Sequence, residues 1–549
     1  MSARRSGCIP ISLAMVLVFH LVPNARGGHP ELARYSYDHD AILWFIQIAD
    51  IHVGEDVYGG TQDTDNLDWM TSIAYNTIMP EFIIAAGDLC DGTNGALIPS
   101  VQHVEEWLTY REILANNQMD PTSYHDVPGN HDAYGDPGFH YFLTYGMSGA
   151  AFGTTQHSWT VEKPFGTYHF MMINTASSDG LPCPFDNSGL APGELREIDA
   201  GLDHNRDANQ HFIFGHHPKE NLFTGRDAFF AMLNTYKVSL YGFGHTHVHS
   251  CETPLETPWT IHLNTASLGK SATDHYQLIA IDNDAVVVGS KDVGAFPVVL
   301  ITAPVPYQGC TGEEFRYKVP LHNSDNPVRA LVFDIDQESI ESVKFTIDSS
   351  TFNTMERIGE SSVWEGFFDG FHYDYGVHSL TVRVRGSSTV SETVPIKLEQ
   401  TECSDGIDND GDGLIDSADG GCDDAFDDSE RGYDETPTVH LRLNGTRFTA
   451  GDRFRLRFDV SNPGGELAAV QYVLLEIDGA FWSYPAWTAG VDGIPLRIAA
   501  GQGWSEYILD FIWPEDTGTG ERLRFWAALI EPGANELIGS FDMVEWGYE

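Results

Sequence analysis

The sequence predicts an α/β domain in its first half and two β-sandwich modules after it. Up to about residue 293, short apolar runs alternate with helical patterns, as in βαβ units. Beyond that point apolar and polar residues alternate between turn residues, and no helical stretch interrupts them. A chain of 549 residues is also too long for one core, because domains usually hold about 100–200 residues. We place a signal peptide, the α/β domain, an Ig-like sandwich, an acidic linker and a C-terminal sandwich at residues 1–27, 37–293, 296–400, 402–434 and 435–549.

The N-terminal residues have the pattern of a secretory signal peptide. Arg4 and Arg5 precede an apolar run from Ile9 to Val22, and small residues follow it. The run is shorter than the about 20 residues that span a bilayer, and no later run is long enough. We therefore expect a secreted, periplasmic or cell-surface protein with no transmembrane segment in the mature chain. An uncleaved membrane anchor is the alternative.

The charge of the chain limits its partners. The sequence has 80 acidic and 30 basic residues, a formal charge of −50. Such a surface repels polyanions and attracts cations such as calcium. We expect no nucleic-acid docking surface.

Secretion would expose the cysteines to an oxidising compartment, where disulfides form. We expect Cys183 to pair with Cys251 across the rim of the site described below, while Cys90 stays a buried free thiol. The alternatives pair Cys90 with one of these two, or join Cys310 to the first domain.

The predicted strands of the first half run directly into polar motifs. They are 44–49 before Asp50, 82–86 before Gly87-Asp88, 212–214 before Gly215-His216, and 238–243 before Gly244-His245. Ligand sites of open α/β sheets form beyond the carboxyl ends of strands, so we expect one here. Between these strands, Val101, Val104 and Leu108 have the spacing of one helix face.

The second half contains predicted sandwich strands. Residues 328–334, 343–347 and 380–384 are expected in the first sandwich, and Phe454 to Val460 in the second.

Five short segments supply carboxylates, imidazoles and one amide. They are Asp50-Ile51-His52, Gly87-Asp88-Leu89-Cys90-Asp91-Gly92, Gly129-Asn130-His131-Asp132, Gly215-His216-His217-Pro218 and Gly244-His245-Thr246-His247. Each alone is more often a turn or a satisfied buried polar group than a ligand, but together and in this order they are specific. Mixed oxygen and imidazole ligands suit manganese, iron or zinc.

This succession of motifs resembles the calcineurin-like metallophosphoesterase superfamily over roughly the first 300 residues. The resemblance implies a four-layer α/β/β/α fold that binds two metal ions. It assigns the first metal to Asp50, His52 and His247, the second to Asn130, His216 and His245, and the bridging position to Asp88. It gives His131 the catalytic role beside the leaving group, oriented by a carboxylate for which Asp50 and Asp132 are the candidates.

A finer resemblance is to the transmembrane protein 62-like phosphoesterases. It is carried by residues 59–64, by residues 91–95 and by the sandwich that follows the domain. Purple acid phosphatases differ, because they have a tyrosine where this chain has Asp91. His217 and His249 adjoin ligands and are expected to be supporting or surface residues.

The resemblance implies hydrolysis of phosphate mono- or diesters by attack of a hydroxide that bridges the two metals. The substrate partner would then be a phosphate ester. Decay to a vestigial domain would be expected to remove a ligand, and none is missing.

The linker carries a second metal pattern. Its acidic residues have the spacing of an EF-hand-like calcium loop, at Asp408, Asp410, Asp412, Asp416 and Asp419. Cys403 and Cys422 flank the loop and are expected to pair. The segment resembles calcium loops between modules of secreted bacterial proteins, and a solvated acidic linker is the alternative. The alternative function is a calcium-dependent surface or adhesion protein with a weak or vestigial phosphoesterase domain, whose sandwiches contact a cell surface or matrix.

Overall fold

The computed structural model describes most of the chain from residue 33 onward. The described residues are 33, 35–54, 62–92, 101–178, 181–182, 188–270, 274–307, 318–407, 409, 415–416, 422, 425–426, and 437–548 without 445, 463–466, 478, 490–491, 500–502, 515–517 and 533–536. The predicted signal peptide, Cys183, Cys310 and the calcium-loop residues Asp408, Asp410, Asp412 and Asp419 lie outside them. Within the described residues, no helix has the length and apolar character needed to cross a membrane.

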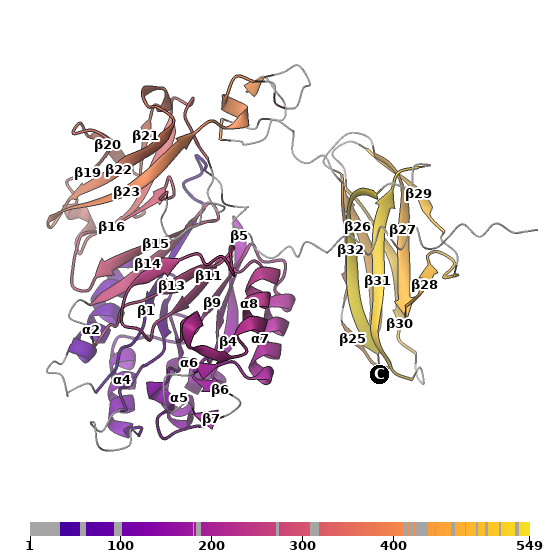
Figure 1. Ribbon diagram of the computed structural model, residues 1–549, viewed down its shortest axis with the longest axis horizontal. Helices are drawn as coiled ribbons and strands as arrows, with labels where there is room; N and C mark the ends of the chain where they lie inside the picture. Colours follow the sequence, from indigo (N-terminus) through magenta and orange to yellow (C-terminus); the bar gives the residue numbers. More distant parts are fainter. Residues whose placement is uncertain are drawn as a thin grey trace, which may run out of the picture. The chain divides into compact units, whose positions relative to one another are not determined.

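The first domain contains two facing β-sheets (Figure 1). One has the order β15-β14-β1-β2-β3, formed by Ala285–Asp292, His275–Asp282, Ile42–Ile48, Ile83–Ala86 and Tyr124–Val127. The other has the order β12-β13-β11-β9-β5-β4, formed by Ser250–Glu252, Ile261–Asn264, Leu240–Phe243, Gln210–Phe214, Gly166–Met172 and His157–Lys163. All four strands predicted before the motifs are present, as β1, β2, β9 and β11.

The sheets are buried on both faces, which explains their nearly continuous apolar sequences. In β1, Leu43 and Phe45 enter the core between the sheets, while Ile46 and Ile48 enter a core shared with helices. In β9, Phe212 faces the inter-sheet core and Ile213 the helices on the other side. The alternation therefore produces the four predicted layers.

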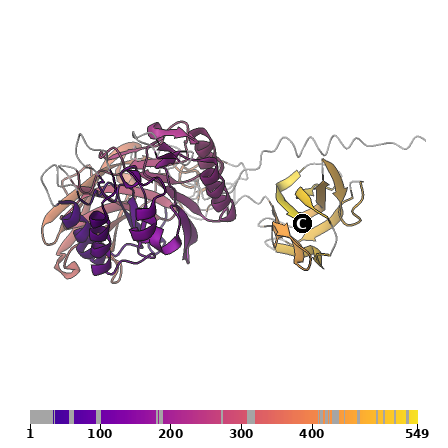
Figure 2. The same cartoon turned by 90° about the horizontal axis from the view of Figure 1, so that it is seen from below.

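The helices cover the two outer faces (Figures 1 and 2). On one side lie α2, the π-helical turn η2, α3, α4, α5 and α6, at Gln62–Trp69, Met70–Ala74, Tyr75–Ile78, Val104–Asn116, His140–Tyr145 and Met147–Phe152. On the other lie α7 and α8, at Pro192–His204 and Arg226–Thr235. The predicted helix is present as α4, but the predicted face is wrong, because Val101 and Leu108 are exposed.

The buried face of α4 consists of Trp107, Tyr110 and Leu114. The indole N–H of Trp107 donates to Gln102 at 2.7 Å, and the hydroxyl of Tyr110 donates to Asp126 at 2.8 Å. Because the polar ends of Trp107 and Tyr110 have hydrogen-bond partners, these large rings can be buried, and Val101 and Leu108 stay exposed.

A β-rich module follows the first domain. Its strand order is β16-β18-β21-β20-β19-β22-β23-β17, formed by Val298–Ala303, Asn326–Phe333, Val363–Phe368, Asn353–Arg357, Ser342–Ile347, Gly376–Arg385, Thr389–Glu399 and Val319–Pro320. Val299 and Val332 face its own core, whereas Leu300, Leu331 and Phe333 pack into the core of the α/β domain. The described residues up to Ile407 accordingly form one compact unit.

The C-terminal sandwich belongs to a second compact unit. Three strands, β24, β26 and β30, pair in one sheet at Thr438–Leu443, Arg453–Ser461 and Gly503–Ile512. The other sheet contains β25, β32, β31, β27, β28 and β29, at Arg447–Phe448, Leu537–Tyr548, Gly520–Ile530, Leu467–Ile477, Ala480–Ser483 and Ile494–Ile498. Inward residues such as Phe454, Phe458 and Phe525 form its core, as the alternating pattern predicted.

Candidate metal centre

The loops after β1 and β2 hold three of the predicted ligands in an uncommon backbone conformation. Asp50, His52 and Asp88 have φ angles of 52°, 53° and 51°. The N–H of Asp50 donates to the carbonyl of Gly87, and the N–H of His52 to that of Asp88, both at 3.0 Å. Positive φ is unfavourable for residues other than glycine, by about 1–3 kcal/mol each. Hydrogen bonds between the loops therefore stabilise this conformation.

His245 and His247, after β11, also have positive φ angles, of 73° and 59°. The N–H of His245 donates to both carboxylate oxygens of Asp50, at 3.0 and 2.8 Å. The preceding Gly244 must be glycine, because a Cβ there would lie 2.2 Å from Asp50 Oδ2. This interlocking brings the β11 loop onto the β1 loop.

The first predicted ligand set converges. His247 Nε2 lies 3.2 Å from Asp50 Oδ1 and 3.1 Å from His52 Nε2. His52 Nε2 also lies 3.8 Å from Asp88 Oδ2. One donor atom from each of Asp50, His52 and His247 lies within 4.8 Å of the others, so the group can hold a metal ion.

The second set meets on the other side of Asp88. His216 Nε2 lies 3.1 Å from Asp88 Oδ2 and 3.2 Å from Asn130 Oδ1. His245 Nδ1 lies 3.0 Å from the same amide oxygen. All seven predicted ligands are thus brought together, with Asp88 between the two groups.

The charges of this centre favour a cation. Burial alone would raise the pKa of Asp88, but the adjacent His216 and His131 hold it well below the usual range. Burial opposes protonation of His216, yet the Asp88 carboxylate raises the pKa of this imidazole to about 9. Burial lowers the pKa of His52 to about 4, so this ring is neutral. Neutral imidazoles and ionised carboxylates are the forms that bind metals, and a metal ion would displace the proton of His216.

The predicted catalytic imidazole lies beside Asp91. His131 Nδ1 is 2.5 Å from the Asp91 carbonyl and 3.6 Å from Asp91 Oδ1. Its Nε2 faces Asp88 Oδ2 at 4.0 Å, and the side chain is 15% exposed. We expected Asp50 or Asp132 next to this ring, and the structure gives that position to Asp91.

Asp132 is directed toward the backbone of the neighbouring loop. Its carboxylate accepts the N–H groups of Leu89, Cys90 and Gly129 at 2.8–3.2 Å. Burial, followed by the nearby Asp88, raises the pKa of Asp132 to about 8. The side chain therefore braces the loop that carries Asp88.

Among the predicted extra residues, His217 is buried and His249 is exposed. His217 contacts Thr175 Oγ1 at 3.0 Å and Ser188 Oγ at 2.9 Å. The structure also shows one contact that was not predicted. The amide nitrogen of Asn221 lies 3.2 Å from His245 Nε2. Asn221 lies outside every motif, although its position shortly after Gly215-His216-His217-Pro218 was a signal.

Cys90 is a buried free thiol, as predicted. Cys251, Cys403 and Cys422 are disulfide-bonded. The proposed partner of Cys251, Cys183, lies outside the described residues.

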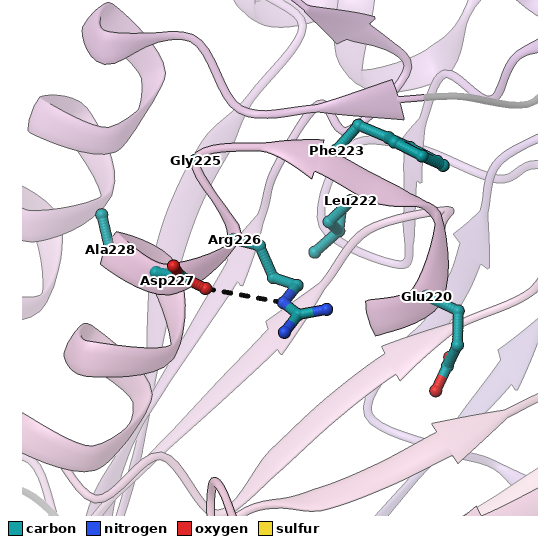
Figure 3. Close-up of a pocket in the computed structure, with 7 residues that line it drawn as sticks. All are labelled: Glu220, Leu222, Phe223, Gly225, Arg226, Asp227 and Ala228. Atoms are coloured by element: carbon teal, nitrogen blue, oxygen red, sulfur yellow. Dashed lines mark ion pairs between the residues drawn. The ribbon is translucent and has the colours of Figure 1, made fainter.

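A pocket lies in the segment that follows the fourth motif (Figure 3). It is lined by Glu220, Leu222, Phe223, Gly225, Arg226, Asp227 and Ala228. Asn221, which contacts His245, lies within this segment. The Arg226 guanidinium points into the pocket and pairs with Asp227 at 3.6 Å, while the Phe223 side chain is 63% exposed.

The fold and the ligand clusters define a metallophosphoesterase α/β domain, and comparison with known proteins agrees. Residues 43–249 match the family model described as calcineurin-like phosphoesterase, so the chain contains a domain of this kind. Transmembrane protein 62 of Mus musculus is 26% identical over 390 residues, which are 68% of this chain and 57% of the relative. The chain thus spans little more than half of that relative's length. A solved dimetal phosphatase from Danio rerio is 14% identical with a TM-score of 0.37, over 46% of this chain and 97% of the other.

Proposed function

We propose that this protein hydrolyses phosphate mono- or diesters at a two-metal centre. The observation that carries the proposal is the convergence of seven side chains from five separate loops into two groups that share Asp88. They are Asp50, His52, Asp88, Asn130, His216, His245 and His247. Manganese, iron and zinc are the metals that suit this set.

Two bound metal ions would supply an activated water and neutralise charge on the phosphoryl group. The chain's own contribution to proton transfer is His131. Its Nδ1 faces the Asp91 carbonyl, which fixes the ring with a proton on Nδ1 and leaves Nε2 on the side of Asp88. In the protonated ring, Nε2 can donate to the departing oxygen, a general-acid contribution of about 10²–10⁴-fold.

The pocket lined by residues 220–228 is our candidate for the organic part of the ester, because Asn221 in the same segment contacts His245. Phe223 offers an exposed ring, and Arg226 offers a cation that is half exposed. We propose that this segment contributes to the choice between monoesters and diesters, while the metal ligands serve both.

Turnover of an aryl phosphate monoester and diester by purified protein tests this function. We expect hydrolysis that is lost when the metals are removed and restored by manganese. Metal analysis of the same sample should give two transition-metal ions per chain. A protein that binds two metals without hydrolysing any phosphate ester would contradict the enzyme and favour the surface or adhesion function, for which the compact C-terminal sandwich provides a binding module.

We further propose that the protein is secreted or displayed at the cell surface and that its linker binds calcium through Asp408, Asp410, Asp412, Asp416 and Asp419. The oxygen-rich spacing of the loop and the oxidised Cys403 and Cys422 on either side support this. Selective removal of calcium should raise protease cleavage near Asp410 while esterase activity persists. Equal cleavage with and without calcium would show that the segment is a solvated acidic linker and not a calcium-binding loop.

A further inference from the structure

Lys270 forms an ion pair with Asp91, the carboxylate that lies next to His52 and His131 in the candidate metal centre. Lys270 Nζ is 2.8 Å from Asp91 Oδ1, and the lysine side chain is only 18% exposed. The same oxygen lies 3.2 Å from His52 Nδ1 and 3.6 Å from His131 Nδ1. One buried carboxylate therefore connects the lysine to a metal ligand and to the proposed general acid.

The backbone fixes the position of this lysine. Ser267 Oγ accepts the N–H of Lys270 at 2.8 Å and donates to the carbonyl of Asp50 at 2.7 Å. The N–H of Gly269 donates to that carbonyl at 3.3 Å, and a Cβ on Gly269 would lie 2.0 Å from the carbonyl oxygen of Ile51. The turn that carries Lys270 is thus fastened to the loop that carries Asp50 and His52.

The contacts of Asp91 define what its carboxylate can do. Asp91 Oδ1 lies 3.2 Å from His52 Nδ1, and its negative charge favours the form of His52 that carries its proton on Nδ1 and leaves Nε2 free to bind a metal. Asp91 is 1% exposed, and an uncompensated charge at such a depth is strongly unfavourable. The Lys270 ammonium, 2.8 Å from Oδ1, compensates this charge and holds the carboxylate beside the two histidines.

We propose that Lys270 is a positioning residue, which holds Asp91 so that His52 binds the first metal and His131 faces the leaving group. This role builds on the proposed phosphoesterase function. Lys270 acts through Asp91, because its Nζ is directed at the carboxylate and its turn fixes the β1 loop.

The test compares Lys270→Gln with Lys291→Gln as a matched control. Lys291 makes an ion pair of the same length, 2.8 Å to Glu392, and its side chain is 13% exposed, but both partners lie on β15 and β23 away from the centre. Manganese affinity is measured by calorimetry on metal-free protein. Values of kcat and KM are measured for aryl phosphates whose leaving groups cover a range of pKa.

Removal of the outer partner of a ligand typically costs about 10–100-fold in metal affinity. Because Lys270→Gln keeps Asp91 and removes only the cation that holds it, we expect a loss at one manganese site of about 10-fold, the lower end of that range. We also expect a lower kcat with a steeper dependence on leaving-group pKa, little change in KM, and substantial rescue by Lys270→Arg. If the glutamine variant does not fold, the uncharged Lys270→Met takes its place.

Two results would overturn the proposal. One is behaviour of Lys270→Gln indistinguishable from Lys291→Gln. The other is a higher KM with unchanged manganese affinity and an unchanged leaving-group dependence, which would make Lys270 a substrate-binding residue. Since calorimetry needs no turnover, a wild-type protein without esterase activity would refute the proposed function and still leave the role of Lys270 measurable.

Discussion

At the residue scale, the proposed metal ligands are held in an uncommon backbone conformation. Five of the seven proposed ligands have positive φ angles, and hydrogen bonds between the loops maintain them. At Gly129 a Cβ would lie 2.2 Å from Asp88 Oδ1, so the backbone packs directly against a ligand. The chain thus stabilises an unfavourable local conformation in order to direct its donor atoms toward two points.

Asp88 is the ligand whose loss should have the largest effect, because it belongs to both groups. In Asp88→Asn we expect metal analysis to show a loss at both positions. The fall in turnover should exceed the about 10–100-fold that follows removal of an outer partner of a ligand. Retention of two metals with normal turnover would refute the ligand assignment.

His131 should behave differently, because it is not one of the seven proposed ligands and its proposed role is to protonate the leaving group. His131→Ala should keep both metals and lower kcat by about 10²–10⁴-fold, most strongly for poor leaving groups. His372→Ala, at an exposed histidine of the first sandwich, is the control. Near-normal rates on a poor leaving group would remove the proposed role.

The structure brings the seven proposed ligands together, whereas several of their contacts were not predicted. The seven residues lie in short motifs directly after strands, and strand ends fix where such residues go. Asp91 belongs to one of the predicted motifs, but its contact with His131 could not be predicted, because it depends on how the loop after β2 faces the loop after β3. The contact of Lys270 with Asp91 joins segments far apart in the chain, so the local pattern around Lys270 carried no signal, whereas Asn221 at least follows a motif closely.

At the scale of secondary-structure elements, two histidine pairs lie in the strands of the α/β domain, with His125, His169 and His211 buried and His157 partly buried. His125 Nδ1 lies 3.2 Å from His157 Nε2, and His169 Nδ1 lies 3.0 Å from His211 Nδ1. Burial lowers the pKa to about 3 for His125 and His211, and to about 4 for His157 and His169. The folded protein therefore holds these four rings neutral at pH values where the unfolded chain would protonate them.

This difference predicts the sign of the pH dependence. Because the folded pKa values are lowered from about 6.5, the unfolded state binds more protons between pH 6.5 and 4. Stability from these groups is complete above pH 6.5 and is lost as the pH falls toward 4. We expect His157→Gln and His211→Gln each to flatten the fall in unfolding temperature over this range relative to wild type. A fall as steep as in wild type would show that other groups control acid unfolding.

At the scale of the whole molecule, the first sandwich and the α/β domain share a core, although the sequence predicted two separate modules. Their junction contains Arg329, whose side chain is 1% exposed. It pairs with Asp282 of the α/β domain at 3.0 Å and with Glu365 of the sandwich at 3.2 Å. Alternation along the strands could predict a buried face, but not that both faces of β16 and β18 are buried against different partners.

The shared core predicts that the two parts unfold together. Arg329→Met leaves Asp282 and Glu365 buried without their cation, and breaking a buried pair in this way typically costs about 3–5 kcal/mol. The control is Arg453→Met, because Arg453 pairs with Asp510 on the surface of the C-terminal sandwich, where solvent-exposed ion pairs contribute little to stability. In calorimetry, Arg329→Met should lower the temperature of one transition, that of the α/β domain with the first sandwich, and leave the transition of the C-terminal unit unchanged.

A fragment ending at residue 293 should aggregate, because Leu300, Leu331 and Phe333 would no longer cover its core. A soluble, folded fragment of that length would show that the sandwich is an independent module after all.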